Sequence, residues 1–536
     1  MTVKLKLYAV CALALAALAL SSVGAQEQKT PSAGERTRTL TPSERRGRAI
    51  YLRGESASGK QIKALVGELD VPASTMTCAG CHGARGEGKT EGGVTAGNLT
   101  WANLTKSYGH THPTGRRHGP FDEAAFARAV AAGVDPAGNT LLSAMPRFKM
   151  SPEDAADLIA YVKRIEEDYD PGLSDASLKV GTLLPARGPL AETGAAMRDV
   201  LRAFFDDLNS KGGIYNRRVE LQTAETGPDE AATTENARRL FEQGQIFAAV
   251  SGLSAGADKG LAALAQELEV PFVGPSTLLP HVGSGSNRYL FYLLPGVGEQ
   301  ARALVNFGAR RKISAKASAA VIYPEGEIGT AAASAAEEQC KKVGCGELLK
   351  LSYAPAKFDA PSLARAAKGA DAVYFFGSNG EEAALIREAG AGGGRPDVFL
   401  LGALTGRDLV ASVPATFKGK VFVAFPSVPG DITREGASEL RSLAEKYKFP
   451  LRHRAAQISA LAAAKVMVEG LRRSSSELSR ERLVTALEGL YNYETGLTPR
   501  LMFGPNRRVG AAGAYILAFD AERNGFALPG EWVKAD

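Results

Sequence analysis

The five residues Cys78-Ala79-Gly80-Cys81-His82 constrain this chain more than any other part of its sequence. Two thiols on one turn with an imidazole directly after them can bind zinc, form a redox-active disulfide, or hold a haem covalently. A zinc site would need two further ligands at similar spacing, and a thioredoxin-like site would need a strand before the motif and a helix after it. Neither pattern is present. We therefore expect each thiol to form a thioether bond to haem and His82 to ligate the iron.

Helix signals surround this motif on both sides. Thr41-Pro42-Ser43-Glu44 is a capping box with proline at the first helical position. Ser151-Pro152-Glu153-Asp154 opens another helix, whose apolar residues recur at helical spacing. Residues 122–132 predict a third helix that ends at Gly133.

Three helices around a single C-x-x-C-H motif resemble a class I cytochrome c, from about residue 40 to 167. The resemblance implies an all-α domain whose first and last helices cross at a glycine and aromatic residues, here Gly47, Tyr51 and Tyr161. It also implies one covalent haem c with a second axial ligand late in the domain. Met145 is the candidate for that ligand.

Two alternatives to Met145 stay open at this point. Met150 could ligate the iron instead, or His110, His112 or His118 could give bis-histidine coordination. The histidines lie in a stretch rich in Gly, Pro and Arg, residues 108–120, which we predict to be a solvated loop. One departure from the family is the stretch 61–75, which lengthens the gap before the haem motif. We expect it to change a loop without removing a ligand.

The first 25 residues predict export. Lys4 and Lys6 precede an apolar run from Leu7 to Leu20, and small residues follow up to Ala25. This is the pattern of a signal peptide cleaved after Ala25. An uncleaved membrane anchor is the alternative, but the run is shorter than the roughly 20 residues that span a bilayer. We expect a periplasmic protein with no stable membrane insertion.

Length, charge and cysteine usage narrow the function classes. A chain of 536 residues predicts two or three domains. Its net charge of +6, which becomes 6 − 2 = +4 without Lys4 and Lys6, is too small to argue for nucleic acid. Such a charge could favour an acidic redox partner. In an oxidising compartment, Cys340 and Cys345 are expected to form a disulfide.

Residues 168–177 are acidic, contain Pro and Gly, and lack apolar periodicity, so we interpret them as a linker. From residue 178 onward, short β-rich runs alternate with amphipathic helices, which predicts parallel sheets with right-handed crossovers. The expected strands are Lys179–Leu184, Val219–Thr223, Phe247–Val250, Pro271–Val273, Ala319–Tyr323, Ala372–Phe376, Val398–Leu401 and Val421–Ala424. The chain has no G-x-G-x-x-G motif after a strand and no Walker lysine.

Several short motifs in this second half occur in a familiar order. They include Gly181 to Pro185, Asn209 to Ile214, Val250 to Ser254, Val273 to Ser276, and Phe503 to Pro505. Together they resemble the branched-chain amino-acid (Leu/Ile/Val-binding) type of periplasmic solute-binding protein over residues 178–533. The resemblance implies a type I binding-protein fold: two α/β lobes joined by hinge crossings, with the ligand held between them. We therefore expect a two-lobed α/β domain after the all-α cytochrome c domain.

The resemblance also places a ligand site. Its carboxylate-binding loop falls at Ser254, Ala255 and Gly256, and the next loop contributes Ser276 and Thr277. Three family positions differ: Leu278 replaces a hydroxyl residue, Ile328 replaces a tyrosine, and Leu404 replaces the acid that binds the ligand's ammonium group. A desolvated ammonium group needs a carboxylate or several carbonyls. We therefore expect a ligand other than a free amino acid: a less polar carboxylate, or an alcohol-derived or aromatic compound.

Three acidic residues, Glu325, Glu327 and Glu381, could compensate for the missing acid, and an empty cleft is the remaining alternative. Asp258, Ser276 and His281 could form a catalytic triad, but the chain has no G-x-S-x-G motif. We therefore expect no catalysis.

The combined expectation is periplasmic electron transfer with a dehydrogenase or oxidase as redox partner. The alternatives are a solute receptor for an ABC permease with an accessory or redox-sensing haem, and a cytochrome whose binding domain has become a scaffold.

Overall fold

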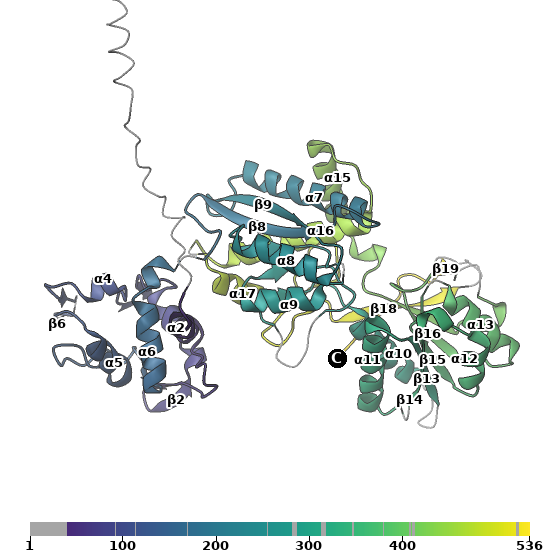
Figure 1. The fold of residues 1–536 in the computed structure, drawn as a ribbon, viewed down its shortest axis with the longest axis horizontal. Helices are drawn as coiled ribbons and strands as arrows, with labels where there is room; N and C mark the ends of the chain where they lie inside the picture. The colour runs from purple at the N-terminus through teal and green to yellow at the C-terminus, as the bar shows by residue number, and fades with distance from the viewer. Residues whose placement is uncertain are drawn as a thin grey trace, which may run out of the picture. The chain divides into compact units, whose positions relative to one another are not determined.

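The computed structural model describes residues 40–536 except 92, 113, 169, 255, 281–286, 312–317, 346–347, 379, 407–408, 410–412, 477 and 521–524. The expected signal peptide, residues 1–25, lies outside this range. The chain divides into two compact units, and the second begins at Asp170 (Figure 1). None of the helices in the described residues is long and apolar enough to cross a membrane.

The first unit is built mainly from helices. These are α2 (Pro42–Arg53), α3 (Cys78–His82), α4 (Trp101–Leu104), α5 (Glu123–Ala132) and α6 (Pro152–Val162). The predicted capping box is present, because Thr41 accepts a hydrogen bond from the Glu44 amide and the Glu44 side chain accepts one from the Thr41 amide. Gly133 ends α5 in the left-handed conformation, with φ of 69°.

Short strands supplement these helices, and the sequence analysis did not predict them. They are β1 (Lys63–Val66), β2 (Leu69–Pro72), β3 (Lys89–Glu91), β4 (Val94–Ala96), β5 (His110–Thr111), β6 (Arg117–His118) and β7 (Arg147–Lys149). β2, β1 and β7 form one antiparallel sheet in that order. β5 and β6 form a hairpin inside the stretch 108–120, and His118 is buried. The stretch is thus ordered as a short hairpin, although most of its described residues are exposed, as expected for a solvated loop.

The first lobe of the second unit contains a parallel sheet in the order β12-β11-β10-β8-β9 among the described residues. Its strands are β8 (Ser177–Leu184), β9 (Arg218–Glu225), β10 (Ala248–Val250), β11 (Phe272–Val273) and β12 (Leu290–Phe291). Its helices are α7 (Ala191–Ser210), α8 (Glu230–Glu242), α9 (Asp258–Glu267), α15 (Arg434–Tyr447), α16 (Arg454–Arg473) and α17 (Arg480–Glu488).

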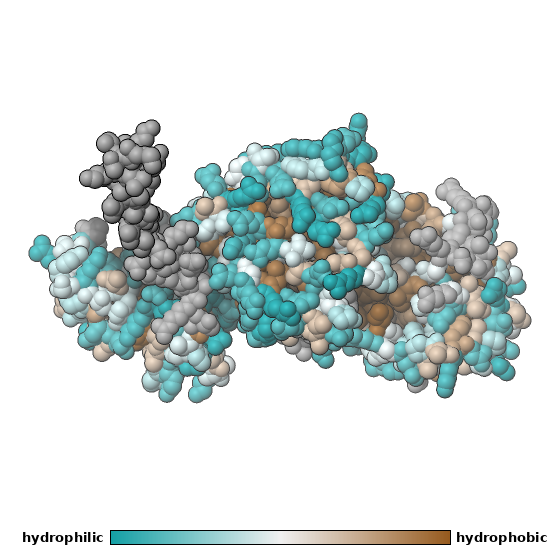
Figure 2. Space-filling model, turned by 45° about the horizontal axis from the view of Figure 1, so that its top comes forward, coloured by the Kyte–Doolittle hydropathy of each residue, from teal (hydrophilic) through white to brown (hydrophobic). Residues whose placement is uncertain are grey.

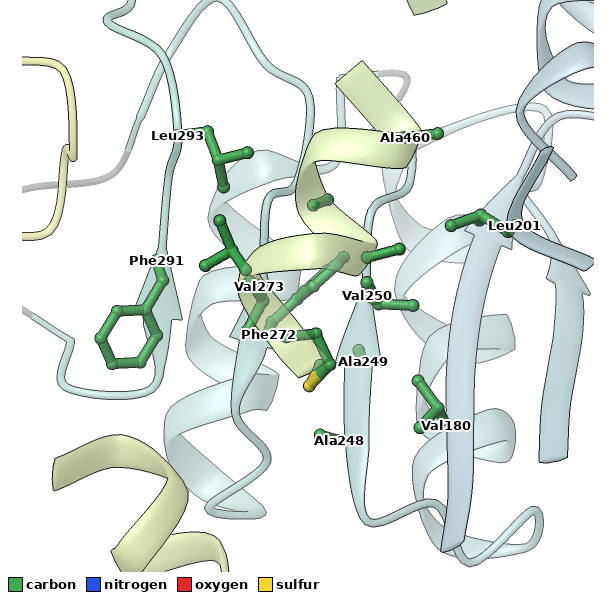
Figure 3. Packing of buried hydrophobic residues seen from close by; sticks show 14 of the residues in the cluster. Val180, Leu201, Ala248, Ala249, Val250, Phe272, Val273, Phe291, Leu293 and Ala460 are labelled. Carbon is green, nitrogen blue, oxygen red and sulfur yellow. The ribbon is translucent and has the colours of Figure 1, made fainter. Parts of the chain in front are cut away.

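Helices cover both faces of this sheet, and β10, β11, β12 and most of β8 are buried apolar runs, whereas β9 at the sheet edge has one buried residue, Val219. On one face α16 lies over β10 and β11, with Val250 and Val273 beside it (Figure 3). α8 and α9 lie on the opposite side of the sheet from α7 and α16 (Figure 1).

The second lobe has a larger sheet in the order β14-β13-β15-β16-β17-β18-β19, with β20 also paired to β18. Its strands are β13 (Ala319–Pro324), β14 (Leu348–Tyr353), β15 (Ala372–Phe375), β16 (Asp397–Leu401), β17 (Val421–Phe425), β18 (Gly513–Asp520), β19 (Gly525–Phe526) and β20 (Glu531–Lys534). Its helices are α10 (Val297–Arg310), α11 (Glu327–Val343), α12 (Ala360–Ala366) and α13 (Glu381–Ala391). The chain passes between the lobes near residues 293–297, 425–433 and 511–513.

The predicted linker is partly bonded to the second unit. The Arg480 amide donates to the Asp170 carboxylate at 2.7 Å, and the Lys179 amide donates to the Gly172 carbonyl at 2.8 Å. Leu173 pairs with Leu178 in an isolated β-bridge. Residues 170–173 are therefore ordered against the second unit.

Candidate functional site: a haem-attachment motif and an interlobe cleft

The cysteine motif forms a helix of its own. Thr77 caps α3 by accepting a hydrogen bond from the Gly80 amide at 3.2 Å. Cys78 is half-buried, Cys81 is exposed, and both thiols are free. One helical turn thus presents two free sulfur atoms directly before a buried histidine.

His82 is held in one tautomer. Its Nδ1 lies 2.7 Å from the carbonyl oxygen of Gly97, and because that oxygen can only accept, Nδ1 carries the proton. Burial lowers the pKa of His82 more than this hydrogen bond raises it, so the neutral ring is favoured. Within the described residues Nε2 has no hydrogen-bond partner. A neutral imidazole with a free Nε2 is the form that ligates a metal.

The first and last helices of this unit cross in close contact, as the resemblance implies. A Cβ atom on Gly47 would lie 1.9 Å from the Asp157 carbonyl oxygen and 2.8 Å from the Tyr161 Cβ atom, so only glycine fits. The rings of Tyr51 and Tyr161 lie 5.6 Å apart. The Tyr51 hydroxyl donates to the Gly83 carbonyl at 2.7 Å, which ties this crossing to the chain directly after His82.

Met145 and Met150 lie on either side of β7. Both side chains are half-buried and pack against the apolar core of the first unit, as does Cys78. Cys78, Met145 and Met150 thus all contact the same core cluster. Two thiols, a neutral imidazole and a thioether are the donor set that a haem c needs, and these residues fit that group.

The three histidines of the alternative coordination form a cluster with each other. Nε2 of His112 lies 2.9 Å from Nε2 of His118, and His110 Nε2 bonds the Asn103 carbonyl at 2.8 Å. Arg116 bonds His112 at 2.9 Å and pairs with Asp135 at 2.6 Å. Burial, followed by the charge of Arg116, lowers the pKa of His112. The described residues contain no group of three or more His, Cys, Asp or Glu side chains arranged to hold a metal ion.

In the second unit, strand order indicates where a ligand would bind. Each sheet has a point at which successive connections leave in opposite directions, between β8 and β10 in the first lobe and between β13 and β15 in the second. Open α/β sheets bind ligands at the carboxyl ends of the strands beside such a point. Apolar residues are visible in the indentation between the two lobes (Figure 2).

The first-lobe candidates lie at this edge of the sheet. Ser254 is buried in the loop after β10. That loop runs beside the one after β11, because Leu253 and Ser276 form a bridge and the Ser276 amide donates to the Gly252 carbonyl at 2.9 Å. Ser276 and Thr277 are half-buried and Gly256 is exposed. Ala255 and His281 lie outside the described residues.

Two of the candidate hydroxyls already have partners. Ser276 Oγ lies 3.2 Å from Ser459 Oγ on α16, and Thr277 Oγ1 accepts a hydrogen bond from the Leu279 amide at 2.8 Å. Each hydroxyl can also bond a ligand, because it has a donor and two acceptor positions.

The side chains that replace polar family residues are Leu278, Ile328 and Leu404. Ile328 and Leu404 pack against the same core cluster of the second lobe, as does Leu279. Leu278 is 37% exposed.

The acidic residues differ in their surroundings. Glu325 and Glu327 are exposed. Glu381 accepts hydrogen bonds from the Tyr353 hydroxyl at 2.7 Å and the Ser378 amide at 2.9 Å. The sequence analysis missed Glu382, which is 1% exposed and accepts from the Gly406 amide at 2.7 Å. The sequence offered one signal for Glu382: it directly follows Glu381, which was already a candidate, and both lie in the first turn of α13.

A separate cavity of about 530 Å³ lies near the hinge crossings. Its lining includes Asp431, Arg507, Tyr515, Trp532 and Lys534, and none of the predicted ligand-binding residues. The Tyr515 hydroxyl donates to Asp431 at 2.6 Å across it.

Cys340 and Cys345, far from this cavity in sequence, are joined by a disulfide at the end of α11.

These features define a class of protein: a cytochrome c domain followed by a two-lobed periplasmic solute-binding domain. A sequence profile of the periplasmic binding protein family matches residues 177–524, and the chain belongs to this family. A cytochrome c profile matches residues 73–166. Both recognised domains and the order of fold types predicted from the sequence are thus confirmed.

Individual relatives agree with this assignment. Leu/Ile/Val-binding protein homolog 7 of Brucella abortus is 25% identical over 236 residues, which cover 42% of this chain and 59% of the relative. The chain thus spans less than two thirds of that relative's length.

Solved structures show the same fold. A branched-chain amino acid ABC transporter protein from Thermus thermophilus with bound valine has a TM-score of 0.52 at 19% identity, covering 68% of this chain and 97% of that one. A fatty acid ABC transporter substrate-binding protein from Thermomonospora curvata has a TM-score of 0.51 at 18% identity, covering 68% of this chain and 95% of that one.

Proposed function

We propose that this protein is a periplasmic electron carrier in which a monohaem cytochrome c domain, residues 40–167, is joined to a small-molecule-binding domain, residues 178–533. The observation that carries the proposal is the arrangement of His82, whose Nδ1 proton is held by Gly97 while Nε2 is free. A bound haem c supplies a one-electron iron couple. Cys78 and Cys81 would hold it covalently, and His82 and Met145 would be its axial ligands.

Met145 is preferred over the histidines for a physical reason. The Nε2 atoms of His112 and His118 bond each other, that of His110 bonds the Asn103 carbonyl, and Arg116 also bonds His112. Met145 precedes β7 directly and has a half-buried side chain at the apolar edge of the core. With both axial positions filled by the protein, the iron has no open coordination site, which favours electron transfer over catalysis.

The haem assignment is tested on protein purified from the periplasm. We expect a pyridine haemochrome spectrum and the mass of one haem added to a chain that begins at residue 26. Met145→Ala is expected to remove the near-infrared charge-transfer band of thioether-ligated ferric iron, and Met150→Ala is the matched control. If only Met150→Ala loses the band, Met150 and not Met145 is the axial ligand. The mass of a bare polypeptide would refute the electron-carrier function.

Electron transfer itself is tested by stopped-flow mixing of the oxidised protein with reduced periplasmic dehydrogenases, followed at the haem absorbance. A rate that falls steeply as salt is raised is expected for an acidic partner, because the mature chain carries a small positive charge. Failure of every periplasmic donor to reduce the haem at a useful rate would contradict the proposal.

For the binding domain, we propose an apolar or weakly polar ligand with a carboxylate or hydroxyl group. The loop amides around Ser254 and Ser276 can bond such a group, while Ile328 and Leu404 offer its other end an apolar surface. The fold itself accommodates both classes, because the solved relatives include one described with valine and one described as a fatty acid transporter protein.

Calorimetry with short-chain and aromatic carboxylates, alcohols and amino acids tests the ligand class. We expect amino acids to bind at least about 100-fold more weakly than the best carboxylate, since an unpaired ammonium group costs several kcal/mol to desolvate. In the variant Leu404→Asp, amino-acid binding should improve. Tight binding of a free amino acid to the unaltered protein would contradict this ligand class.

A second function, solute receptor for an ABC permease, is favoured by the match of residues 177–524 to the binding-protein family. Calorimetry on the oxidised and the reduced protein separates the two functions. Equal affinity in both states together with permease genes beside the coding gene would favour the receptor. A dehydrogenase gene beside it would favour electron transfer.

A further inference from the structure

The stretch 61–75, which lengthens the gap before the haem motif, is an ordered part of the cytochrome c domain. It forms the hairpin β1–β2, and β1 also pairs with β7 on its other side. β1 is therefore the central strand of this small sheet. β7 starts at Arg147, two residues after Met145.

The pairing joins two segments that are far apart in the chain. Lys63 lies opposite Lys149, Ala64 opposite Phe148, and Leu65 opposite Arg147. Ala64 is fully buried and Phe148 is 5% exposed, so this contact belongs to the core of the domain. Burial of an aromatic side chain stabilises the folded state, so the pairing is more than a surface contact.

Charges support the same pairing at its edge. Asp70 on β2 lies 2.9 Å from the Lys149 ammonium group and 3.9 Å from that of Lys63. The Lys149 hydrogen bond is the main cause that lowers the pKa of Asp70. Through this ion pair β2, the outer strand of the hairpin, also contacts β7 on the other side of β1.

The loop that carries Met145 is also held from its other side. The Arg147 guanidinium donates to the carbonyl of Leu141 at 2.9 Å and to the carbonyl of Met145 itself. A Cβ atom added to Gly133 would lie only 1.8 Å from Arg147 Nε, so the guanidinium packs directly against this glycine. The Leu141 amide in turn donates to the Gly133 carbonyl at 2.8 Å.

We infer that the β1–β2 hairpin is a positioning element that holds the Met145 loop for axial ligation of the haem iron. The inference rests on the proposed role of Met145. A thioether is an uncharged, weak ligand, so its occupancy depends on a loop that is ordered before it binds. Each loop residue that must otherwise be ordered on ligation costs conformational entropy. The pairing of β1 with β7 makes part of that ordering independent of the iron.

The test uses the full-length holoprotein and the variant Ala64→Pro. Proline in a central strand removes a ladder donor and is poorly tolerated, so the pairing with β7 should weaken. Thr111→Pro is the matched control, because β5 pairs only with β6 among the described strands. Asp70→Lys is a second, milder variant that leaves the core unchanged and places three ammonium groups together.

Two measurements report on the ligand rather than on activity. They are the near-infrared charge-transfer band of the ferric protein and the affinity of imidazole for the ferric iron. In Ala64→Pro, with haem still attached, we expect a weakened band and imidazole binding about tenfold tighter. Asp70→Lys should give a change of roughly twofold in the same direction. Thr111→Pro should match the unaltered protein.

The outcomes separate the two proposals. If the unaltered protein lacks the band, Met145 is not the ligand, and both the assignment and the inference drawn from it fail. If the unaltered protein has the band while folded Ala64→Pro and Asp70→Lys keep both its intensity and the original imidazole affinity, the hairpin has no positioning role. In that case the Met145 assignment stands alone.

Discussion

Among single residues, Gly47 leaves little freedom for substitution, because a Cβ atom there would meet the backbone of the opposite helix. The resemblance to class I cytochromes c implied this contact and the tyrosine pair beside it. The apolar cleft residue Leu279 was not predicted. Its neighbour Leu278 was the family position, and no sequence pattern tells which of two adjacent leucines in a loop turns inward.

Gly47→Ala should destabilise the cytochrome c domain. The added methyl group would lie 1.9 Å from the Asp157 carbonyl oxygen, so α2 and α6 must move apart. Overpacking of this kind costs about 1–3 kcal/mol. Urea unfolding followed at the haem absorbance measures the loss. Arg45→Ala, at an exposed position on the same helix, should stay within about 0.5 kcal/mol, and an equal loss in both variants would contradict the explanation.

The carboxylate of Asp157 should make the stability of this domain depend on acid. Burial alone would raise the pKa of Asp157, but hydrogen bonds from Arg46 and Ser43 outweigh it and lower the pKa. The lowered pKa means that the stabilisation is complete above the unfolded-state value of about 3.9 and is lost as the pH falls through the folded-state value. Urea midpoints of Asp157→Asn should therefore fall less than those of the unaltered protein between about pH 5 and pH 2. If the urea midpoints of both proteins fall equally with pH, the Asp157 carboxylate does not cause the acid dependence.

At the scale of helices and strands, the sequence predicted most of the strands of the second unit. All eight predicted strands there are present, and most of them are runs of buried apolar residues. β12 and β18 are also largely buried but were missed. β14 was missed because it is an edge strand with five of its six residues at least partly exposed, on a lysine- and serine-containing run. β1 and β2 were missed for a different reason: the strand that stabilises them, β7, lies some 80 residues away in the chain.

The disulfide between Cys340 and Cys345 should stabilise the end of α11. It closes a loop with a sequence separation of only five residues, so its expected contribution is about 2 kcal/mol. Cys345→Ala, which leaves buried Cys340 in place, should lower the free energy of unfolding of the second unit by that amount. Reduction of the unaltered protein should reproduce the loss, and reduction of the variant should cause no further change. An effect of the reductant on the variant would assign the loss to another site.

At the scale of the whole molecule, two units that share no core cluster predict separate unfolding events. The first unit has its own apolar core around Tyr51 and Tyr161, and the second has separate cores in its lobes. Calorimetry of the holoprotein should show at least two transitions. In Cys78→Ala/Cys81→Ala, which cannot retain the haem, the transition of the cytochrome c domain should move to lower temperature while that of the binding domain is unchanged. A shift of both would show that the units unfold together.

The order in which the chain visits the two lobes has a consequence for its biosynthesis. The first lobe needs α15, α16 and α17, and the second lobe needs β18, although both lobes begin more than 100 residues earlier. A nascent chain can complete the cytochrome c domain from one continuous segment. Neither lobe can close its core until almost all of the sequence has been made. The incompletely covered sheets are therefore exposed to chaperones and proteases throughout that interval, long after the first unit has become resistant to both.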